Sequence, residues 1–587
     1  MKEMNIVIEI CGSAGEGTIS AGEILSRFMS SQGFEIMSFD AYPAEIRGFG
    51  KCVAHTRISS SPIYSPGKQA DVLIALNDGH SISQLPALKG DGILIYDSQP
   101  AKAHEEDKSV LGWAPAEVTS YGVPLTMLAQ KAAGNARGRN MVALGAVAAL
   151  FDLNQEDFCE SIKGRYAKKK QIVIDSNVNS FKEGFAWTRE NFEVNSRFVF
   201  EQGRAQDGDS EKWIINGNQL VAKAALDADL KFFAGYPITP ATKIMEILSK
   251  ELPSHGGTLL QTEDEISAIG AVVGAGFGGI RAMTATSGPG FALMTEFQGL
   301  SVMAEIPAVI VNSQRGGPST GIPTKTEQSD FNAAVKGGTG DCPRVVLAPT
   351  DTRSCYDATV LGLYIAEKYQ TLVVILLDFF LSNSIRNILP PEKPGEDALN
   401  ANVTPGEDAM KDYKRYLMTE DGISPRPIPG TPGGMHFSTG LEHDEYGRPD
   451  YSEKGHTEMT EKRHRKHLSV LNEAPAPIVR GLEDGGADIG VISWGSSAGA
   501  AEEAVMFARN EGVSAAVFSS VMLSPFPDDA LKAFCDQCKT LLVPELNHGG
   551  QFADYVAAAV HRPVERLNFI TGRPMASEDI LQKIREM

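Results

Sequence analysis

The chain turns sharply at Phe233-Ala-Gly-Tyr-Pro-Ile-Thr-Pro-Ala-Thr242, and a second polar turn, Thr262-Glu-Asp-Glu265, follows about two dozen residues later. The apolar run that enters the first turn predicts a short buried strand, and the run that leaves it predicts an amphipathic helix. Two prolines fix the backbone and leave Thr239 displayed between them. Strand, turn and helix in this order are typical of an α/β protein, and we expect this turn to contact the substrate.

Composition limits the class of protein. A chain of 587 residues is too long for one hydrophobic core, so we expect about three or four domains. The formal net charge of −20 argues against nonspecific binding to nucleic acid, which depends on positive charge paired with phosphates. No apolar run is as long as a membrane span, and the N-terminus enters a strand pattern directly, so we predict a cytoplasmic protein without a membrane segment.

The seven cysteines are scattered and odd in number, which is typical of a reducing compartment rather than of a disulfide framework. Cys535 and Cys538 form a lone C-x-x-C, which cannot by itself supply four thiolates to a metal or cluster. We therefore interpret them as unpaired cysteines and keep a redox pair as the alternative.

The N-terminal region alternates strand-like and helix-like segments from residue 6 to about 186, which predicts a parallel sheet covered by helices. Its first turn contains Gly12, Gly15 and Gly17, and backbone N–H groups at the following helix could hold a phosphate or carboxylate. The glycine order differs from the dinucleotide fingerprint, so a tight-packing turn is an equal alternative. Arg47 lies in a later glycine-containing loop, as a functional cation or as part of a surface turn.

The next domain has the most specific organisation in the chain. Four successive strand candidates each end in a polar or glycine-rich turn, and the carboxyl ends of parallel strands meet at one edge of a sheet. We therefore expect the four turns to converge on one crevice. The turns are Gly235-Tyr-Pro-Ile-Thr239, Gln261-Thr-Glu-Asp-Glu265, Thr286-Ser-Gly-Pro-Gly290 and Asn312-Ser-Gln-Arg315 with the glycines after it.

Two later regions complete the chain. From about 389 the sequence is rich in Pro, Gly and charge, and it is too long for an ordinary loop, so we predict an extended surface segment. Its histidines lack the tight spacing of a metal site, and we predict no metal ligand in this chain. The last region, from about 474, again alternates strands and helices and predicts another α/β domain.

The expected crevice offers chemistry for a small carboxylate. Arg315 would bind it through a bidentate fork and Thr239 through a single donor, with charge-assisted bonds worth roughly 1.5–3 kcal/mol each. Glu265 has two interpretations, because a carboxylate at the start of a helix is often only a cap that compensates the helix dipole. Glu263 and Asp264 share that interpretation.

Four motifs in this region resemble those of the α subunit of 2-oxoacid:ferredoxin oxidoreductases: Tyr236-Pro-Ile-Thr-Pro, Glu265-Ile-Ser-Ala-Ile-Gly-Ala, Thr284-Ala-Thr-Ser-Gly-Pro-Gly and Gln314-Arg-Gly-Gly-Pro-Ser-Thr-Gly-Ile-Pro-Thr-Lys-Thr-Glu-Gln. The N-terminal part, with Gly12 to Gly17 and Tyr42 to Gly48, resembles the γ subunit of that family, fused here ahead of α. Thr419-Glu-Asp-Gly-Ile-Ser-Pro-Arg426 and Gly430-Thr-Pro-Gly-Gly-Met-His resemble its 2-oxoglutarate branch.

The resemblance implies a multidomain α/β fold with these boundaries: a γ-type domain over 1–190, a linker over 191–212, a thiamine-diphosphate pyrimidine-binding-type domain over 213–388, the extended segment over 389–473, and a transketolase C-terminal-like domain over 474–587.

The resemblance also implies site roles. Glu265 would face N1′ of the thiamine aminopyrimidine, which activates the cofactor, and Thr239 and Arg315 would hold the 2-oxoacid carboxylate. Lys325 is a candidate for a second substrate carboxylate, with Arg426 and a partner subunit as alternatives. The other implied cofactor contacts are Tyr236, Pro237, Ile238, Ser287 and Gly288, and the N-terminal glycine loop with Arg47 is a candidate site for coenzyme A or another anion.

Part of the family's chemistry is expected on another chain. Gly90-Asp-Gly92 resembles the start of the motif that holds magnesium in thiamine-diphosphate enzymes, but no Asn follows in the region from Ala114 to Gly122, so we predict a helix-to-strand turn. The family keeps that motif and its cysteine set on a β subunit. We therefore expect Mg²⁺ and a [4Fe-4S] cluster on this partner, ferredoxin as electron acceptor, and a dimer of αβ heterodimers that is inactive without β.

The resemblance thus implies CoA-dependent oxidative decarboxylation of 2-oxoglutarate to succinyl-CoA. Two alternatives stay open: a pyruvate or branched-chain 2-oxoacid enzyme of the same family, and a nucleotide- or CoA-binding module without redox chemistry, if the glycine loop were the main site.

Overall fold

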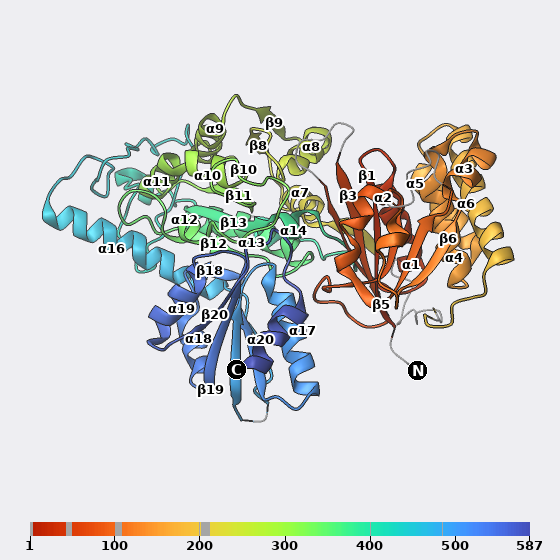
Figure 1. Ribbon diagram of the computed structural model, residues 1–587. Coiled ribbons are helices and arrows are strands. Elements are labelled where there is room, and N and C mark those ends of the chain that lie inside the picture. Colours follow the sequence, from red (N-terminus) through yellow and green to blue (C-terminus); the bar gives the residue numbers. More distant parts are fainter. Residues whose placement is uncertain are drawn as a thin grey trace. The chain divides into compact units, whose positions relative to one another are not determined.

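The computed structural model describes residues 4–42, 50–99, 109–198, 200, 212–399, 401–483 and 485–587. The chain divides into two compact units, Met1–Ile215 with Ser384–Pro390, and Asn216–Asn383 with Pro391–Met587. Both units are built of sheets covered by helices (Figure 1), which confirms the predicted multidomain α/β class. Among the described helices, none has both the length and the apolar character needed to cross a membrane.

The first unit contains an eight-stranded sheet in the order β6-β5-β4-β1-β3-β2-β14-β7. Its strands are β1 (Asn5–Ser13), β2 (Glu35–Ala41), β3 (Lys51–Ser59), β4 (Ala70–Ala75), β5 (Leu88–Asp97), β6 (Thr119–Val123), β7 (Trp213–Asn216) and β14 (Ile385–Ile388). Its helices are α1 (Thr18–Ser31), α2 (Asp78–Ile82), α3 (Leu125–Ala133), α4 (Arg139–Leu150), α5 (Gln155–Tyr166) and α6 (Gln171–Asn191).

This sheet is mixed, whereas the alternation of elements predicted a parallel one. Strand β1 is parallel to β4 but antiparallel to β3, and β3 is also antiparallel to β2. The connection from Ala41 to Lys51 is shorter than the roughly dozen residues that a parallel crossover needs, so β2 and β3 must run in opposite directions. Gly90-Asp-Gly92 lies inside β5 rather than in a turn before it.

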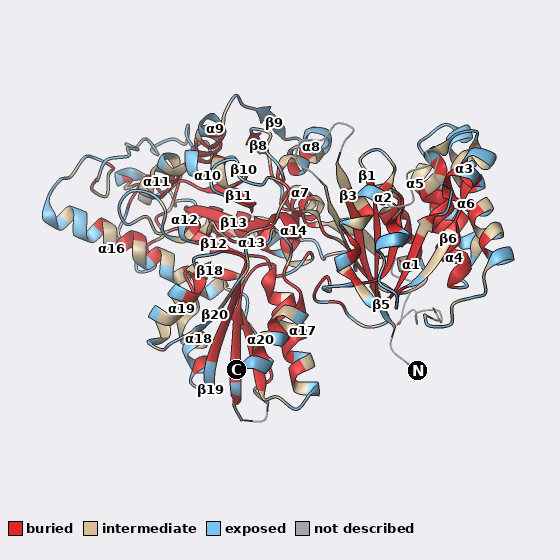
Figure 2. Ribbon diagram, in the orientation of Figure 1, coloured by how far each residue is buried: buried red, intermediate tan, exposed pale blue. Residues whose placement is uncertain are grey.

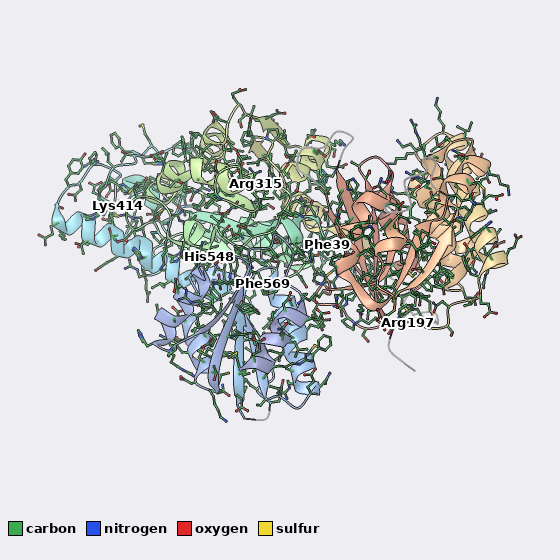
Figure 3. All side chains as sticks on the ribbon, viewed as in Figure 1. Phe39, Arg197, Arg315, Lys414, His548 and Phe569 are labelled. Atoms are coloured by element: carbon green, nitrogen blue, oxygen red, sulfur yellow. The ribbon has the colours of Figure 1, made fainter. Side chains whose placement is uncertain are left out.

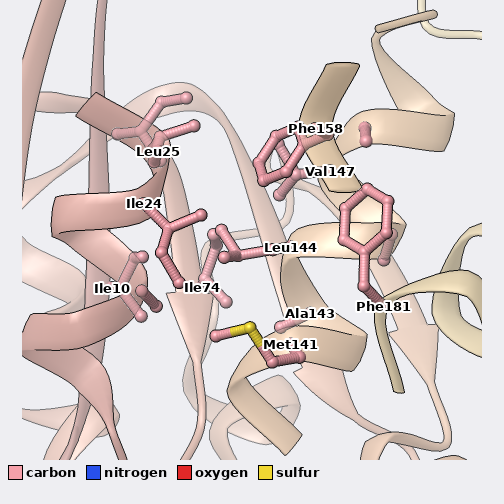
Figure 4. Packing of buried hydrophobic residues seen from close by; sticks show 14 of the residues in the cluster. Ile10, Ile24, Leu25, Ile74, Met141, Ala143, Leu144, Val147, Phe158 and Phe181 are labelled. Atoms are coloured by element: carbon pink, nitrogen blue, oxygen red, sulfur yellow. The ribbon is translucent and has the colours of Figure 1, made fainter. Parts of the chain in front are cut away.

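One hydrophobic core holds the helices of the first unit to its sheet. Ile10 and Ile74 project from the sheet toward Ile24 and Leu25 of α1, and Leu144 of α4 packs beside them (Figure 4). Helix α4 is buried from Asn140 to Leu150, because its residues after Asn140 are apolar on every side. It lies against α6, where Gly145 and Gly184 permit close approach of the two backbones.

The second unit contains a seven-stranded sheet in the order β18-β12-β13-β11-β10-β8-β9. Its strands are β8 (Phe232–Gly235), β9 (Thr258–Gln261), β10 (Ala282–Thr286), β11 (Ala308–Gln314), β12 (Val345–Leu347), β13 (Leu372–Asp378) and β18 (Met522–Ser524). The helices around it are α7 (Gly217–Asp227), α8 (Thr242–Glu251), α9 (Glu265–Phe277), α10 (Gly288–Leu293), α11 (Thr295–Met303), α12 (Phe331–Lys336), α13 (Ser354–Tyr369) and α14 (Phe379–Asn383).

The described part of the range predicted as an extended segment contains two α-helices, α15 (Glu396–Leu399) and the 17-residue α16 (Glu453–Ser469). A buried charge cluster attaches α16 to the sheet domain. The Glu305 carboxylate accepts hydrogen bonds from Lys462 Nζ at 2.6 Å and Lys466 Nζ at 2.5 Å. Arg415, from the extended segment, donates to the Glu305 carbonyl at 2.6 Å. The cluster thus links α16 and the part of the extended segment around Arg415 to the residues that follow α11.

The last domain of this unit is a five-stranded sheet, here called the C-terminal sheet, in the order β15-β17-β16-β19-β20. Its strands are β15 (Ile478–Arg480), β16 (Ala487–Ser493), β17 (Ala515–Ser519), β19 (Cys538–Glu545) and β20 (Glu565–Asn568). Helices α17 (Ser497–Asn510) and α20 (Ser577–Glu586) cover one face, and α18 (Asp528–Cys535) and α19 (Gln551–Val560) cover the other (Figure 1).

The interior strands of the three sheets, such as β4, β11, β13 and β16, are buried along most of their length (Figure 2), whereas the edge strands β9, β15 and β20 are mostly exposed. A shared core joins the two sheets of the second unit, since Phe331, Trp494 and Phe552 pack ring against ring. Cys535 and Cys538 belong to this core as free cysteines. Burial raises the pKa of Cys535 to about 12 and that of Cys538 to about 11, so both are protonated, apolar packing groups at neutral pH.

Candidate active site

The four predicted turns meet at one edge of the seven-stranded sheet. Strands β11, β10, β8 and β9 are consecutive neighbours in that sheet, and each adjacent pair is parallel. Their carboxyl ends therefore lie together at this edge, as the sequence predicted. The first turn is exposed: 40% of the Tyr236 surface is accessible, and Thr239 is exposed beside it.

Glu265 is the first residue of α9, and only 7% of its surface is exposed. The capping role that the sequence left open belongs to its neighbour, because Asp264 Oδ1 accepts a hydrogen bond from the Ser267 N–H at 2.7 Å. That bond lowers the pKa of Asp264. Among the described residues, no group hydrogen-bonds the Glu265 carboxylate, which leaves it available to a ligand.

The first turn of α10, directly after β10, packs on Glu265. A Cβ atom at Gly290 would lie 2.5 Å from Glu265 Oε1 and 2.2 Å from Thr286 Oγ1, so only glycine fits there. Ser287 is fully buried, and its Oγ has no hydrogen-bond partner among the described groups. A buried hydroxyl without a partner beside an unpaired carboxylate is a polar cradle that a bound polar ring would satisfy.

Arg315 follows β11 (Figure 3), and only 7% of its surface is exposed. Its Nη1 donates to the Thr239 carbonyl at 2.7 Å, which ties the turn after β8 to the turn after β11. Its Nε is buried and has no partner within the described part of the chain. The Nε–Nη2 edge of the guanidinium is therefore the fork that can take a carboxylate. Burial lowers the pKa of Arg315, but Asp330 and Glu265 oppose that shift and keep the cation charged.

The structure adds Asp330, which the sequence analysis missed. In the sequence it resembles a helix cap before α12, but its side chain makes no capping bond there. Asn312 Nδ2 instead donates to Asp330 Oδ2 at 3.0 Å, and a Cβ atom at Gly288 would lie 3.1 Å from the same oxygen. Burial raises the pKa of Asp330. Asp330 thus lies against Gly288, at the start of α10.

Residues 315–330, here called the clamp loop, bring the backbone of a second basic residue, Lys325, next to that of Gly316. The Gly316 N–H donates to the Lys325 carbonyl at 3.0 Å, and the Ile322 N–H donates to the Gly316 carbonyl at 2.8 Å. These bonds close a hairpin with Arg315 and Lys325 at its base. Arg426, the other candidate in this chain, donates to Glu367 and to the Gly276 carbonyl near the end of α9, far from Glu265, so its role is in packing.

Three family models match the chain. One, described as pyruvate flavodoxin/ferredoxin oxidoreductase, thiamine diphosphate-binding, covers residues 223–462 and so contains Glu265, Arg315 and Lys325. The others, described as pyruvate ferredoxin/flavodoxin oxidoreductase and as pyruvate:ferredoxin oxidoreductase core domain II, cover residues 7–187 and 487–580. The 2-oxoglutarate synthase subunit KorA of Methanothermobacter thermautotrophicus is 38% identical over 64% of this chain and 99% of its own length.

This chain belongs to the 2-oxoacid:ferredoxin oxidoreductase family.

Some relatives match this oxidoreductase subunit over nearly its whole length. The 2-oxoglutarate oxidoreductase subunit KorA of Mycobacterium tuberculosis is 30% identical over 99% of this chain and 91% of its own length. Among solved structures, a 2-oxoglutarate:ferredoxin oxidoreductase from Magnetococcus marinus, with 2-oxoglutarate, coenzyme A and succinyl-CoA bound, covers 99% of both chains at a TM-score of 0.92 and 37% identity.

The glycine loop of the oxidoreductase's first unit is closed by its own carboxylate. Glu16 Oε2 accepts a hydrogen bond from the Ser13 N–H at 2.7 Å, and Glu16 Oε1 pairs with Arg139 at 2.6 Å. Gly15 and Gly17 have positive φ, and Gly17 packs against Asn140. A phosphate at this loop would have to displace Glu16 and could then pair with Arg139. Arg47 lies outside the described residues.

Proposed function

We propose that this chain is the fused γ–α subunit of a 2-oxoglutarate:ferredoxin oxidoreductase, which decarboxylates 2-oxoglutarate with coenzyme A to give succinyl-CoA and passes the electrons to ferredoxin. The observation that carries the proposal is that two basic residues, Arg315 and Lys325, lie at the base of one hairpin, with Arg315 close enough to Glu265 for their charges to interact. A dicarboxylate can offer one carboxylate to each cation. The bound 2-oxoglutarate of the Magnetococcus marinus relative supports the same substrate.

In this proposal the 2-oxoacid carboxylate lies on the Nε–Nη2 edge of Arg315, because Nη1 is held by the Thr239 carbonyl. The Thr239 hydroxyl adds a single donor. The distal carboxylate pairs with the Lys325 ammonium. Each charge-assisted bond contributes roughly 1.5–3 kcal/mol, which is enough for both cations to determine which 2-oxoacid is bound.

Glu265 prepares the site for the cofactor. When bound, thiamine diphosphate supplies the carbanion-stabilising chemistry that decarboxylation of a 2-oxoacid requires. No described group hydrogen-bonds the Glu265 carboxylate, so it can accept a hydrogen bond from an N–H group of the cofactor ring. This bond would hold a proton at that ring nitrogen. Ser287 and Gly288, with the turn of Tyr236, Pro237 and Ile238, would line the same cradle.

A β subunit is the partner in this proposal. Helix α9 begins at Glu265 and carries exposed apolar residues along one face, since Ile266 is 44% and Phe277 is 39% exposed. Leu293 of α10, close in sequence to the Gly290 turn, is 52% exposed. Exposed apolar side chains on the helix that starts at Glu265, and on the next helix, suit contact with a subunit that carries the rest of the cofactor site. That subunit would hold Mg²⁺ and a [4Fe-4S] cluster, in a dimer of αβ heterodimers.

The remaining assignments rest on the family likeness. We propose that coenzyme A binds at Gly12, Gly15, Gly17 and Arg47. Arg139, which forms an ion pair with Glu16 near this loop, supports the proposal because it could pair with a phosphate of coenzyme A instead. The boundaries at 190, 212, 388 and 473 and a cytoplasmic location stay predictions.

The substrate is tested with the purified complex of this chain and its β subunit. We expect 2-oxoglutarate to reduce a viologen dye only when coenzyme A is present, and the complex to show the brown absorbance of an iron–sulfur protein. A complex that turns over pyruvate but not 2-oxoglutarate would contradict the substrate assignment. A colourless, stable monomer that binds nucleotide would contradict the enzyme class.

A further inference from the structure

The clamp loop is fastened to the C-terminal sheet through Gln328. This residue is fully buried, and its Nε2 donates to the Trp494 carbonyl at 2.9 Å. Its Oε1 accepts from the Leu546 N–H at 3.1 Å, while its own N–H donates to the Leu546 carbonyl at 2.8 Å. Asn547 Nδ2 donates to the Gln328 carbonyl at 3.0 Å. Both the side chain and the backbone of Gln328 are therefore held by another domain.

Those partners lie at the carboxyl ends of two neighbouring strands. Trp494 follows β16, and Leu546 and Asn547 follow β19, which is parallel to β16. His548 and Phe569, which follow β19 and β20, lie at the end of the C-terminal sheet nearest the seven-stranded sheet (Figure 3). The edge of the C-terminal sheet thus serves as the support on which the clamp loop rests.

A second contact from the same edge reaches Lys325 directly. Gly572 follows β20 and has a φ of 69°. A Cβ atom there would lie 2.9 Å from Lys325 Cβ, 3.1 Å from Cγ and 3.3 Å from Cδ. The aliphatic stem of Lys325 therefore lies against the bare backbone of Gly572. Any larger residue at 572 would have to push the stem, and with it the ammonium, out of its present position.

We infer that Gln328 and Gly572 are positioning residues through which the C-terminal domain sets the separation of Arg315 and Lys325, and hence the enzyme's selectivity for a five-carbon dicarboxylate. Arg315 is fixed by β11 and by Thr239, on the seven-stranded sheet. Lys325 is fixed from the other side, because it lies three residues before Gln328 and its stem packs on Gly572. The inference rests on the proposed function.

Two cations at a fixed separation bind best a dicarboxylate whose two carboxylates are the same distance apart. If Lys325 moves, the Arg315 carboxylate contact and the reacting carbonyl are unaffected, but the distal carboxylate loses its partner. A substrate with one carboxylate does not contact Lys325 through a distal carboxylate, so its kcat/KM should not change when Lys325 moves. The ratio of kcat/KM values for the two substrates therefore isolates positioning from general loss of structure.

The test compares Gly572→Ala and Gln328→Met with wild type, in the complex with the β subunit. The substrates are 2-oxoglutarate and 2-oxopentanoate, which has the same carbon chain but a methyl group in place of the distal carboxylate. We expect KM for 2-oxoglutarate to rise about tenfold or more in both variants, with kcat and the 2-oxopentanoate constants within about twofold of wild type.

Gly512→Ala is the matched control for Gly572→Ala, because Gly512 also has a positive φ but nothing lies within 4 Å of its Cβ position. Gly512→Ala introduces the same kind of backbone strain as Gly572→Ala but makes no new side-chain contact. We expect it to leave both substrates' constants unchanged.

The outcomes separate the inference from the function on which it rests. Parallel losses for both substrates, or a lower melting temperature with unchanged selectivity, would show that Gln328 and Gly572 only support the fold. A wild-type complex that ignores 2-oxoglutarate would overturn the proposed function and the inference with it. If Gln328→Met does not fold, Asn547→Ala removes one bond to the same residue, and unchanged selectivity in both Asn547→Ala and Gly572→Ala would refute the inference.

Discussion

The carboxylate of Glu265 lies against Gly290, so closely that a methyl group on Gly290 would be 2.5 Å from Oε1. The carboxylate comes from the start of α9, which follows β9, and the glycine from the first turn of α10, which follows β10; β8 lies between these two strands in the sheet. The backbone of Gly290, which carries no side chain, thus limits where the Glu265 carboxylate can lie. The proposed activity requires that the Glu265 carboxylate is held in this position and has no other hydrogen-bond partner among the described residues.

Replacing Glu265 by Gln tests that dependence. The amide keeps the shape but loses the negative charge that holds a proton on the cofactor ring, so we expect 2-oxoglutarate-dependent dye reduction to fall by about 100-fold or more. Glu263→Gln is the matched control, since Glu263 is an exposed carboxylate two residues away. Near-normal turnover in Glu265→Gln would refute the catalytic role.

Gly290→Ala tests the position of the carboxylate rather than its charge. The added methyl cannot share the space with Glu265 Oε1 and Thr286 Oγ1, so Glu265 must move, and we expect turnover to fall by up to about 100-fold. Gly299→Ala, in α11, meets nothing within 4 Å and should retain activity. Equal activity of the two variants in the dye assay would show that Glu265 can shift without consequence.

Arg315→Lys tests the proposed substrate fork. Lysine keeps the charge but cannot bond the Thr239 carbonyl and a carboxylate in the same planar arrangement. We expect KM for 2-oxoglutarate and for 2-oxopentanoate to rise together, by roughly 10–100-fold, because both substrates carry the 2-oxoacid carboxylate. Steady-state kinetics measure this. A rise confined to 2-oxoglutarate would place Arg315 at the distal carboxylate instead.

Glu305→Gln tests the buried cluster under α16. Burial alone would raise the pKa of Glu305, but Lys462 and Lys466 outweigh it and hold the pKa well below its ordinary value. Removing the charge leaves these cations and Arg415 buried without their anion, so we expect a loss of about 3–5 kcal/mol. The melting temperature should fall accordingly, whereas Glu296→Gln, an exposed change on α11, should have little effect.

The same cluster predicts a pH dependence. Because its pKa is lower in the folded chain, Glu305 contributes stability above the ordinary glutamate range and loses it as pH falls toward the folded-state pKa. The difference in melting temperature between wild type and Glu305→Gln should therefore shrink in acid. Burial lowers the pKa of Lys466 to about 8, so the unfolded chain binds more protons between pH 8 and 10.5 and Lys466 alone makes stability rise with pH there.

Much of the architecture was predictable because it depends on local periodicity. Alternating strands and helices indicated the α/β class, and the rule that parallel strands present their carboxyl ends together brought the turns at Thr239, Glu265, Gly290 and Arg315 to one edge. The first sheet was predicted wrongly because a short connection between β2 and β3 reverses the strand direction, whatever the hydrophobic pattern of each strand.

The sequence by itself determined the fold class, the order of elements and the residue types that meet at the crevice, since these follow from periodicity and turn chemistry along the chain. Only the tertiary structure decided that Asp264 rather than Glu265 caps α9, that Asp330 turns away from its helix toward Asn312, and that Gln328 is held by the C-terminal sheet. The physical reason is that a polar side chain takes the partner that burial brings to it, and partners such as Trp494 are far away in sequence.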